Sequence, residues 1–431
     1  MGLENLEDLV IHTILLKLRP ENAAVVACVN RRFRYSASDE QLWRIFCSED
    51  LDLSSPQDPS GQPISSFKVT YKLWKEAFCM YPWPLVRRAK KCWSMIQTWM
   101  ALNFPEAAST LQKGASEAKL KEVEDKLRVK LPVATRVLYR LCDGQDIAQA
   151  SSGFRLGLIG GYSFYGYVVN VCLLPLNQVI SQTRKFVSQL GFFNRSKHIL
   201  VASSMFREKS FFLNCVTGQL FVGTEDGQMM SCVPDALISS VHDMNGDLPQ
   251  DAMLLWLEEH GRRLQSGMIR VHEEGKIRSI SLFPEAAPYC STAVTNGVQI
   301  RASAVIVPEL CNFQSRQTYY FSYSIRMRLL PQGCILDGVN YPSCQLYWRQ
   351  WIIRANDAVV SDVNGAAVIG KHPLLYPDGE EFVYESCSRM PSTGSIEGVF
   401  TFVTGRLEDP KGRHFHVEVA QFPLEVPEYI F

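Results

Sequence analysis

The stretch GAAVIG at residues 365–370 has the outline of the G-x-G-x-x-G loop that binds phosphate groups, with alanine where the second glycine belongs. A dinucleotide site needs that glycine for close approach of the backbone, and it needs a helix N-terminus behind the loop. Here His372-Pro373 and a Pro-Asp-Gly turn follow, so no helix can form there. We therefore interpret Gly365 and Gly370 as parts of a structural turn, and we expect no cofactor.

Other residues that could do chemistry lack the spacing that chemistry requires. His414 and His416 share one face of a predicted strand, but only Glu418 accompanies them as a third ligand. The 13 cysteines are scattered and form no C-x-x-C pair, so neither a zinc site nor a redox motif is predicted. No metal site and no catalytic residue are expected, although a triad formed only in space is invisible in one sequence.

Composition places the chain among globular proteins. Of its 431 residues, 46% are hydrophobic and 20% are charged, and the formal net charge is zero. A neutral chain argues against nucleic-acid binding. Residues 156–183 carry no charge, but glycines, amides and a proline interrupt them, which favours buried strands over a membrane helix. Unpaired cysteines and the lack of a signal peptide predict a protein of the cytoplasm, the nucleus or both.

Residues 6–43 show helical periodicity. Apolar side chains recur at helical spacing up to Leu18, and Pro20 should end one helix and begin a second. A helical unit of this size buries too little apolar surface to be robust alone. One interpretation is an N-terminal cap that packs on the rest of the chain. The other is that the surplus apolar surface belongs to a partner protein.

The second interpretation agrees with a family pattern. The leading Leu6, the Ile14-Leu15 to Pro20 turn, the run CVNRRFR at 28–34 and the closing Leu42-Trp43 resemble the F-box, although Glu7 stands where a proline is usual. The resemblance implies docking to a Skp-family adaptor, and through it to a cullin and a RING subunit. It assigns adaptor binding to Leu6, Leu9, Ile14, Leu15, Leu18, Pro20, Val25, Val29 and Trp43.

The middle of the chain mixes helical and strand patterns. Ser116 leads into an amphipathic helix, Leu131-Pro132 begins another, and Asp143-Gly144 ends it in a turn. Strand-like runs and a helix at 251–264 follow. This order resembles the SMI/KNR-like (SUKH) domain, an α+β binding module. We predict the F-box and a following helix at 1–85, the SUKH domain at 86–262 and a linker at 263–285.

Beyond residue 286 the apolar period changes to two, with frequent turn signals, which predicts an antiparallel β-sandwich. The motifs that identify it are YFSYSIR at 320–326, WII at 351–353, VIGKHPL at 368–374, P-x-GE-x-F-x-Y-x-S at 377–386 and GS-x-x-G at 394–398. They resemble the ApaG domain, which implies an immunoglobulin/fibronectin-like sandwich at 286–431. The predicted fold is therefore multidomain α+β.

These features favour a non-catalytic substrate receptor of a Skp–cullin–F-box (SCF) ubiquitin ligase. The SUKH and ApaG domains would recruit an unidentified protein for ubiquitination and proteasomal degradation. Two alternatives stay open. One is a nucleotide- or pyrophosphate-binding or hydrolysing enzyme built on the ApaG domain, which full glycines in the 365–370 loop would have favoured. The other is a scaffold that binds the Skp adaptor without directing degradation. We expect no nucleic acid and no membrane among the partners.

Overall fold

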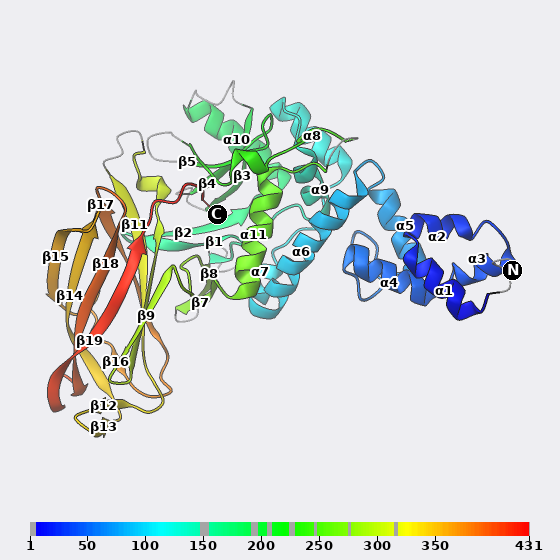
Figure 1. Ribbon diagram of the computed structural model, residues 1–431. Helices are drawn as coiled ribbons and strands as arrows, with labels where there is room; N and C mark the ends of the chain where they lie inside the picture. Colours follow the sequence, from blue (N-terminus) through cyan, green and yellow to red (C-terminus); the bar gives the residue numbers. More distant parts are fainter. Residues whose placement is uncertain are drawn as a thin grey trace.

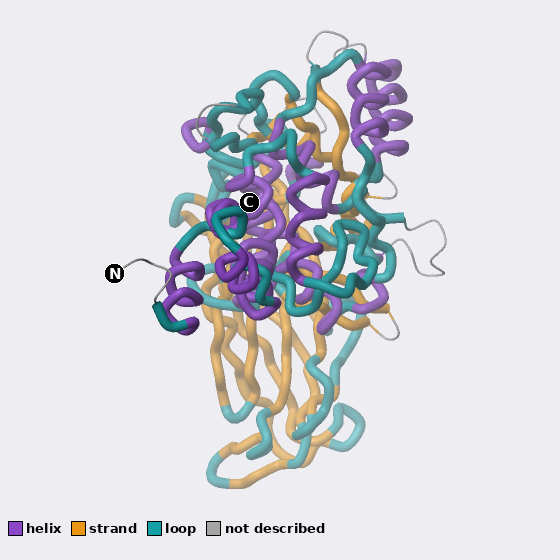
Figure 2. Tube along the Cα trace, turned by 90° about the vertical axis from the view of Figure 1, so that its right-hand side faces the viewer, coloured by secondary structure: helices purple, strands orange, loops and turns teal. Residues whose placement is uncertain are grey.

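The computed structural model describes residues 6–146, 155–190, 197–204, 209–223, 229–244, 248–274, 277–313 and 318–430. Three bodies follow one another in space: a helical unit at the N-terminal end, a central sheet with helices, and a β-sandwich at the far end (Figure 1). Figure 2 views the molecule along this axis, with the helical unit in front of the strands. Multidomain α+β organisation, predicted from the sequence, is confirmed.

The helical unit consists of short helices with sequence-encoded ends. Pro20 is the first residue of its helix, as predicted, because its ring favours helical φ and it has no N–H to leave unpaired. The side chain of Asn30 accepts the backbone N–H of Phe33, which caps the third helix. The helices are α1 (Asp8–Lys17), α2 (Pro20–Val26), α3 (Arg31–Ser36), α4 (Glu40–Leu51) and α5 (Phe67–Ala77).

The next helices lead into the central body. The Ser116 side chain accepts the N–H of Lys119 and begins one of them, and Asp251 accepts the N–H of Leu254 and begins another. Both are the predicted start positions. The helices are α6 (Trp83–Asn103), α7 (Pro105–Ala108), α8 (Glu117–Leu127), α9 (Val133–Leu141), α10 (Leu176–Leu190) and α11 (Ala252–Ser266). No helix of the described residues has the length and apolar character needed to cross a bilayer.

An eight-stranded sheet forms the central body, in the order β6-β5-β4-β3-β2-β1-β8-β7. Helix α11 crosses in front of it in Figure 1. The predicted hairpin with a glycine turn is present, with Gly218 at a φ of +76° between β4 and β5. The strands are β1 (Gly160–Phe164), β2 (Tyr167–Leu173), β3 (His198–Ser204), β4 (Ser210–Asn214), β5 (Leu220–Gly223), β6 (Met229–Ser231), β7 (Arg270–Glu274) and β8 (Ile277–Ser281).

Two local expectations are corrected. The range 263–285 is not a linker: it holds the end of α11 and the hairpin β7–β8, and β8 joins the central sheet beside β1 through the pair Gly161↔Ser281. The charged residues of this range lie on a partly exposed hairpin. Their pattern in the sequence does not predict that β8 pairs with the distant strand β1. The uncharged segment 156–183 is strand only up to Leu173. From Leu176 it is the helix α10, whose first N–H donates to the Asp143 carboxylate.

The C-terminal body is a sandwich of two antiparallel sheets, as predicted. One runs β17-β11-β10-β9, and the other runs β15-β14-β18-β19 with β16 beside β14. Alternate side chains of each sheet fill a shared core that includes Phe321, Trp351 and Phe400. The strands are β9 (Cys290–Thr295), β10 (Val298–Ile306), β11 (Tyr319–Leu329), β12 (Cys334–Leu336), β13 (Val339–Tyr341), β14 (Cys344–Ala355), β15 (Ala358–Ala366), β16 (Leu374–Leu375), β17 (Phe382–Met390), β18 (Gly394–Gly405) and β19 (Pro410–Leu424).

Candidate functional site

Exposed apolar side chains gather on the helical unit at the N-terminal end. Leu9 is 74% exposed and Ile14 is 40% exposed on α1, while Val25 on α2 and Val29 after it are 66% and 65% exposed. Leu6 and Leu18 are half-buried. Single exposed apolar residues are ordinary in proteins, but so many on one small unit are typical of a protein-binding surface.

The other residues predicted to contact an adaptor lie beneath this surface. Leu15 is 1% exposed and Trp43 is 4% exposed, and Pro20 is buried as well. The indole N–H of Trp43 donates to the carbonyl of Ala37 over 2.8 Å. Because these side chains form the interior of the unit, their role in the free chain is to hold α1 and α2 in place. The accessible part of the predicted set is Leu6, Leu9, Ile14, Leu18, Val25 and Val29.

Ion pairs hold the helices of this unit together, and one cation–π contact joins the unit to α6. The carboxylate of Asp8 on α1 lies 2.7 Å from the Arg32 guanidinium on α3. Lys75 of α5 lies 2.7 Å from Glu21 of α2, and its ammonium also sits 4.3 Å from the ring centroid of Trp83. The two ion pairs therefore fix the helices that carry the exposed apolar side chains relative to one another.

The 365–370 stretch contains the last two residues of β15 and the tight turn that follows the strand. The backbones of Val368 and Lys371 exchange two hydrogen bonds, of 3.0 and 2.8 Å, which close the turn on itself. The guanidinium of Arg349 donates to the carbonyl groups of Ala366 and Ala367, so this nearby cation already has partners. No helix follows, in agreement with the structural turn inferred from the sequence.

The two strand histidines have ordinary partners. His414 stacks on Tyr347 with ring centroids 4.9 Å apart, and Nδ1 of His416 lies 3.3 Å from the hydroxyl of Thr401. Within the described ranges no cluster of three or more His, Cys, Asp or Glu side chains could hold a metal ion.

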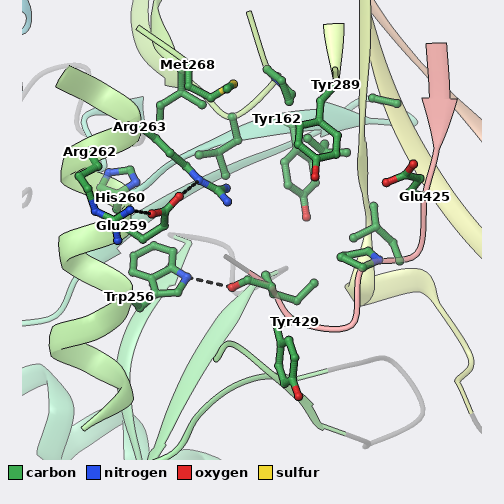
Figure 3. A pocket seen from close by; sticks show the side chains of 18 of the residues that line it. Tyr162, Trp256, Glu259, His260, Arg262, Arg263, Met268, Tyr289, Glu425 and Tyr429 are labelled. Carbon is green, nitrogen blue, oxygen red and sulfur yellow. Dashed lines mark hydrogen bonds and ion pairs between the residues drawn. The ribbon is translucent and has the colours of Figure 1, made fainter. Parts of the chain in front are cut away.

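A cavity of about 940 Å³ lies where α11, the central sheet, the sandwich and the final segment of the chain meet (Figure 3). This cavity could not be predicted from the sequence, because its walls come from segments far apart in the chain. The indole N–H of Trp256 donates to the carbonyl of Ile430 over 2.9 Å, which holds the final segment against α11. Glu259 accepts from both Arg262, at 2.6 Å, and Arg263, at 2.8 Å.

The histidine in this wall is held neutral. His260 stacks on Trp256 with ring centroids 5.4 Å apart and an interplanar angle of 5°. Its Nε2–H donates to the carbonyl of Leu158 over 3.0 Å. Burial lowers the pKa of His260 from 6.5 to about 4, because desolvation disfavours the imidazolium. The side chain is therefore a structural donor near neutral pH.

At the wall of the cavity, three buried polar side chains join the central body to the sandwich, and two of them, Tyr162 and Lys209, line it. The Lys209 ammonium lies 3.2 Å from a Glu309 oxygen and 2.9 Å from the hydroxyl of Tyr162. That hydroxyl donates to the other Glu309 oxygen at 2.8 Å. Burial, followed by the charge of Glu309, raises the pKa of Tyr162 well above its usual value, so the phenol stays protonated. All three groups are satisfied by one another.

Comparison with known proteins agrees with this architecture. The ApaG domain family model matches residues 312–404. F-box protein SKIP16 of Arabidopsis thaliana is 57% identical over 436 residues, which span 100% of this chain and 100% of that protein. F-box only protein 3 of Homo sapiens is 24% identical over 93% of this chain and 78% of its own length. Protein ApaG of Nitrosomonas europaea is 31% identical over 31% of this chain and 93% of its own length.

The fold, the exposed apolar helices and these similarities define the class: an F-box protein with a C-terminal ApaG domain. More narrowly, the chain belongs to the family of F-box proteins that includes SKIP16.

Proposed function

We propose that the chain is the substrate-recognition subunit of an SCF ubiquitin ligase and does no bond chemistry itself. The observation that carries the proposal is the set of exposed apolar side chains on α1, on α2 and after α2, held on a buried core. Burying such side chains against a Skp-family adaptor would contribute about 1.5–3 kcal/mol for each large side chain that becomes fully buried. The adaptor would connect the chain to a cullin and a RING subunit.

The remaining bodies are proposed to recruit the target. The sandwich lies at the far end of the molecule from the exposed apolar helices, and the central body, which we propose to be a SUKH-type module, lies between them (Figure 1). A target bound there would leave the adaptor surface free. All of the cysteines are free thiols, which supports a reducing compartment such as the cytoplasm or nucleus.

The test is co-purification of a Skp-family adaptor with the full chain and with the double variant Leu9→Asp/Val25→Asp. Both side chains are highly exposed, so the charges should leave the fold intact and abolish adaptor capture. The control variant Leu102→Asp/Val216→Asp places the same charges on side chains that are 78% and 62% exposed elsewhere. Undiminished capture by the first variant would contradict the proposal.

A further inference from the structure

Three of the four outer strands of the sandwich are engaged by other parts of the chain. The hydroxyl of Ser291 on β9 donates to the carbonyl of Ala420 on β19 over 2.8 Å, so these two edges close on each other. The edge strand β17 faces the central body, where the N–H of Ser163 donates to the Glu385 carboxylate over 2.7 Å. The fourth outer strand is β15, which lies at the margin of the sandwich beside β14 (Figure 1).

One side of β15 has no strand beside it among the described residues. It pairs with β14 alone, in regular antiparallel register from Ile353↔Ser361 to Trp348↔Ala366. In such a pair alternate residues direct their N–H and C=O groups away from the partner strand. The outward groups of β15 are therefore a template to which another extended backbone can add.

This edge lacks most devices that usually block such pairing. The strand sequence AVVSDVNGA contains no lysine, arginine or proline. The register shift of the pair lies at its far end, between Ile353 and Arg354, and leaves the longer part of the strand regular. Val359, Val360 and Val363 are 54%, 48% and 38% exposed. An exposed edge with several valines has a high propensity to pair with another strand.

The charges at this edge indicate which side chains a strand that adds to it should carry. Asp357, in the turn before β15, and Asp362, within it, are both exposed. Both cations of β14 have other partners: Arg354 lies 2.9 Å from Glu397, and Arg349 donates to backbone carbonyl groups. An added strand that places cationic side chains near the two aspartates, and apolar ones near the valines, would complement this edge. Opposite charges on neighbouring strands stabilise a sheet.

We propose that the β15 edge binds an extended segment of another protein by strand addition, and that this segment alternates apolar with basic residues. The inference depends on the proposed receptor function in one respect: that function identifies the bound protein as the target of the ligase. Backbone hydrogen bonds would supply affinity, and the valines and aspartates would supply selectivity.

The test is binding of a fluorescent peptide of alternating lysine and valine to the full chain, followed by fluorescence anisotropy. The peptide has nine residues, to match β15. We expect saturable binding that the variant Val359→Lys/Val363→Lys weakens by about tenfold or more, because lysine on an edge opposes pairing and repels the peptide. The matched control Val294→Lys/Val339→Lys changes valines that are 52% and 51% exposed elsewhere on the sandwich, and it should bind as the parent does.

Two further peptides separate strand addition from other modes. A peptide with alternate backbone amides N-methylated keeps its side chains and charge but loses donors, so it should not bind; equal binding would overturn strand addition. A glutamate–valine peptide should bind more weakly, and equal binding would overturn the charge argument.

Sedimentation showing a dimer of the chain that Val359→Lys/Val363→Lys abolishes would assign the edge to a second copy and overturn the proposal. Adaptor capture by that variant should persist, so a failure here is distinguishable from failure of the receptor function.

Discussion

Lys209, directly before β4, and Glu309, between β10 and β11 of the sandwich, form an ion pair whose side chains are 4% and 5% exposed. Their atoms approach to 3.2 Å, and the hydroxyl of Tyr162 bonds to both. Two charges removed from water in this way depend on each other, because either one alone would be buried without compensation. We therefore expect the pair to couple the folding of the central body to that of the sandwich.

Replacing Lys209 with methionine should destabilise the chain by about 3–5 kcal/mol, because Glu309 would be left as an unpaired buried charge. Urea denaturation measures this change. The double variant Lys209→Met/Glu309→Leu should recover part of the loss. As a control, Lys411→Met removes a pair whose side chains are 59% and 68% exposed, and it should cause no measurable change. Equal effects of the buried and exposed changes would show that the two bodies fold independently of this pair.

Alanine substitutions at Leu15 and Leu9 should differ sharply in their effect on stability, although both residues belong to the predicted F-box. Leu15→Ala should cost about 2–5 kcal/mol, because it leaves a cavity in the core of the helical unit. Leu9→Ala should change stability by less than about 0.5 kcal/mol, since that side chain lies on the surface. Chemical denaturation of the full chain, followed by tryptophan fluorescence, separates the two. Similar losses for both variants would mean that Leu9 is buried in solution.

The lowered pKa of His260 predicts that the folded chain loses stability in acid. Its pKa is lowered from 6.5 to about 4 in the folded chain, so the neutral ring contributes stability above pH 6.5, and this contribution is lost as the pH falls toward 4. The whole shift corresponds to about 3 kcal/mol. Unfolding measured between pH 7 and pH 4 should show a smaller loss for His260→Leu than for the parent chain. The variant also loses the hydrogen bond to Leu158, which lowers its free energy of unfolding by the same amount at every pH. Parallel pH profiles of the variant and the parent chain would contradict the prediction.

The 365–370 turn should bind no nucleotide. The backbones of Val368 and Lys371 pair with each other across the turn, and Arg349 donates to carbonyl groups beside it. Calorimetry of the full chain with ATP, a diadenosine polyphosphate or pyrophosphate should show no saturable heat. Low-micromolar binding that Lys371→Ala removes would instead support the enzyme alternative.

Local pattern was enough to predict the parts of the fold that local interactions decide. Pro20 and Ser116 mark helix starts through the geometry of their own first turns. The two-residue alternation from Phe321 to Leu329 predicts a strand with one face in the core, and β11 has that face buried. The family motifs of the C-terminal region lie where the ApaG domain family model matches.

What only the tertiary structure decided depends on contacts between distant segments. Leu15 and Leu9 have the same side chain and lie on one short helix, so sequence could not tell which is covered by α3 and α4. The addition of β8 to the central sheet, the cavity beside Trp256 and the pairing of Lys209 with Glu309 each join segments far apart in the chain. The position of β15 as an outer strand that pairs only with β14 among the described residues is likewise decided by the order of strands in the sheet. Periodicity along a chain reports which side of an element is apolar, whereas packing in three dimensions determines what covers that side.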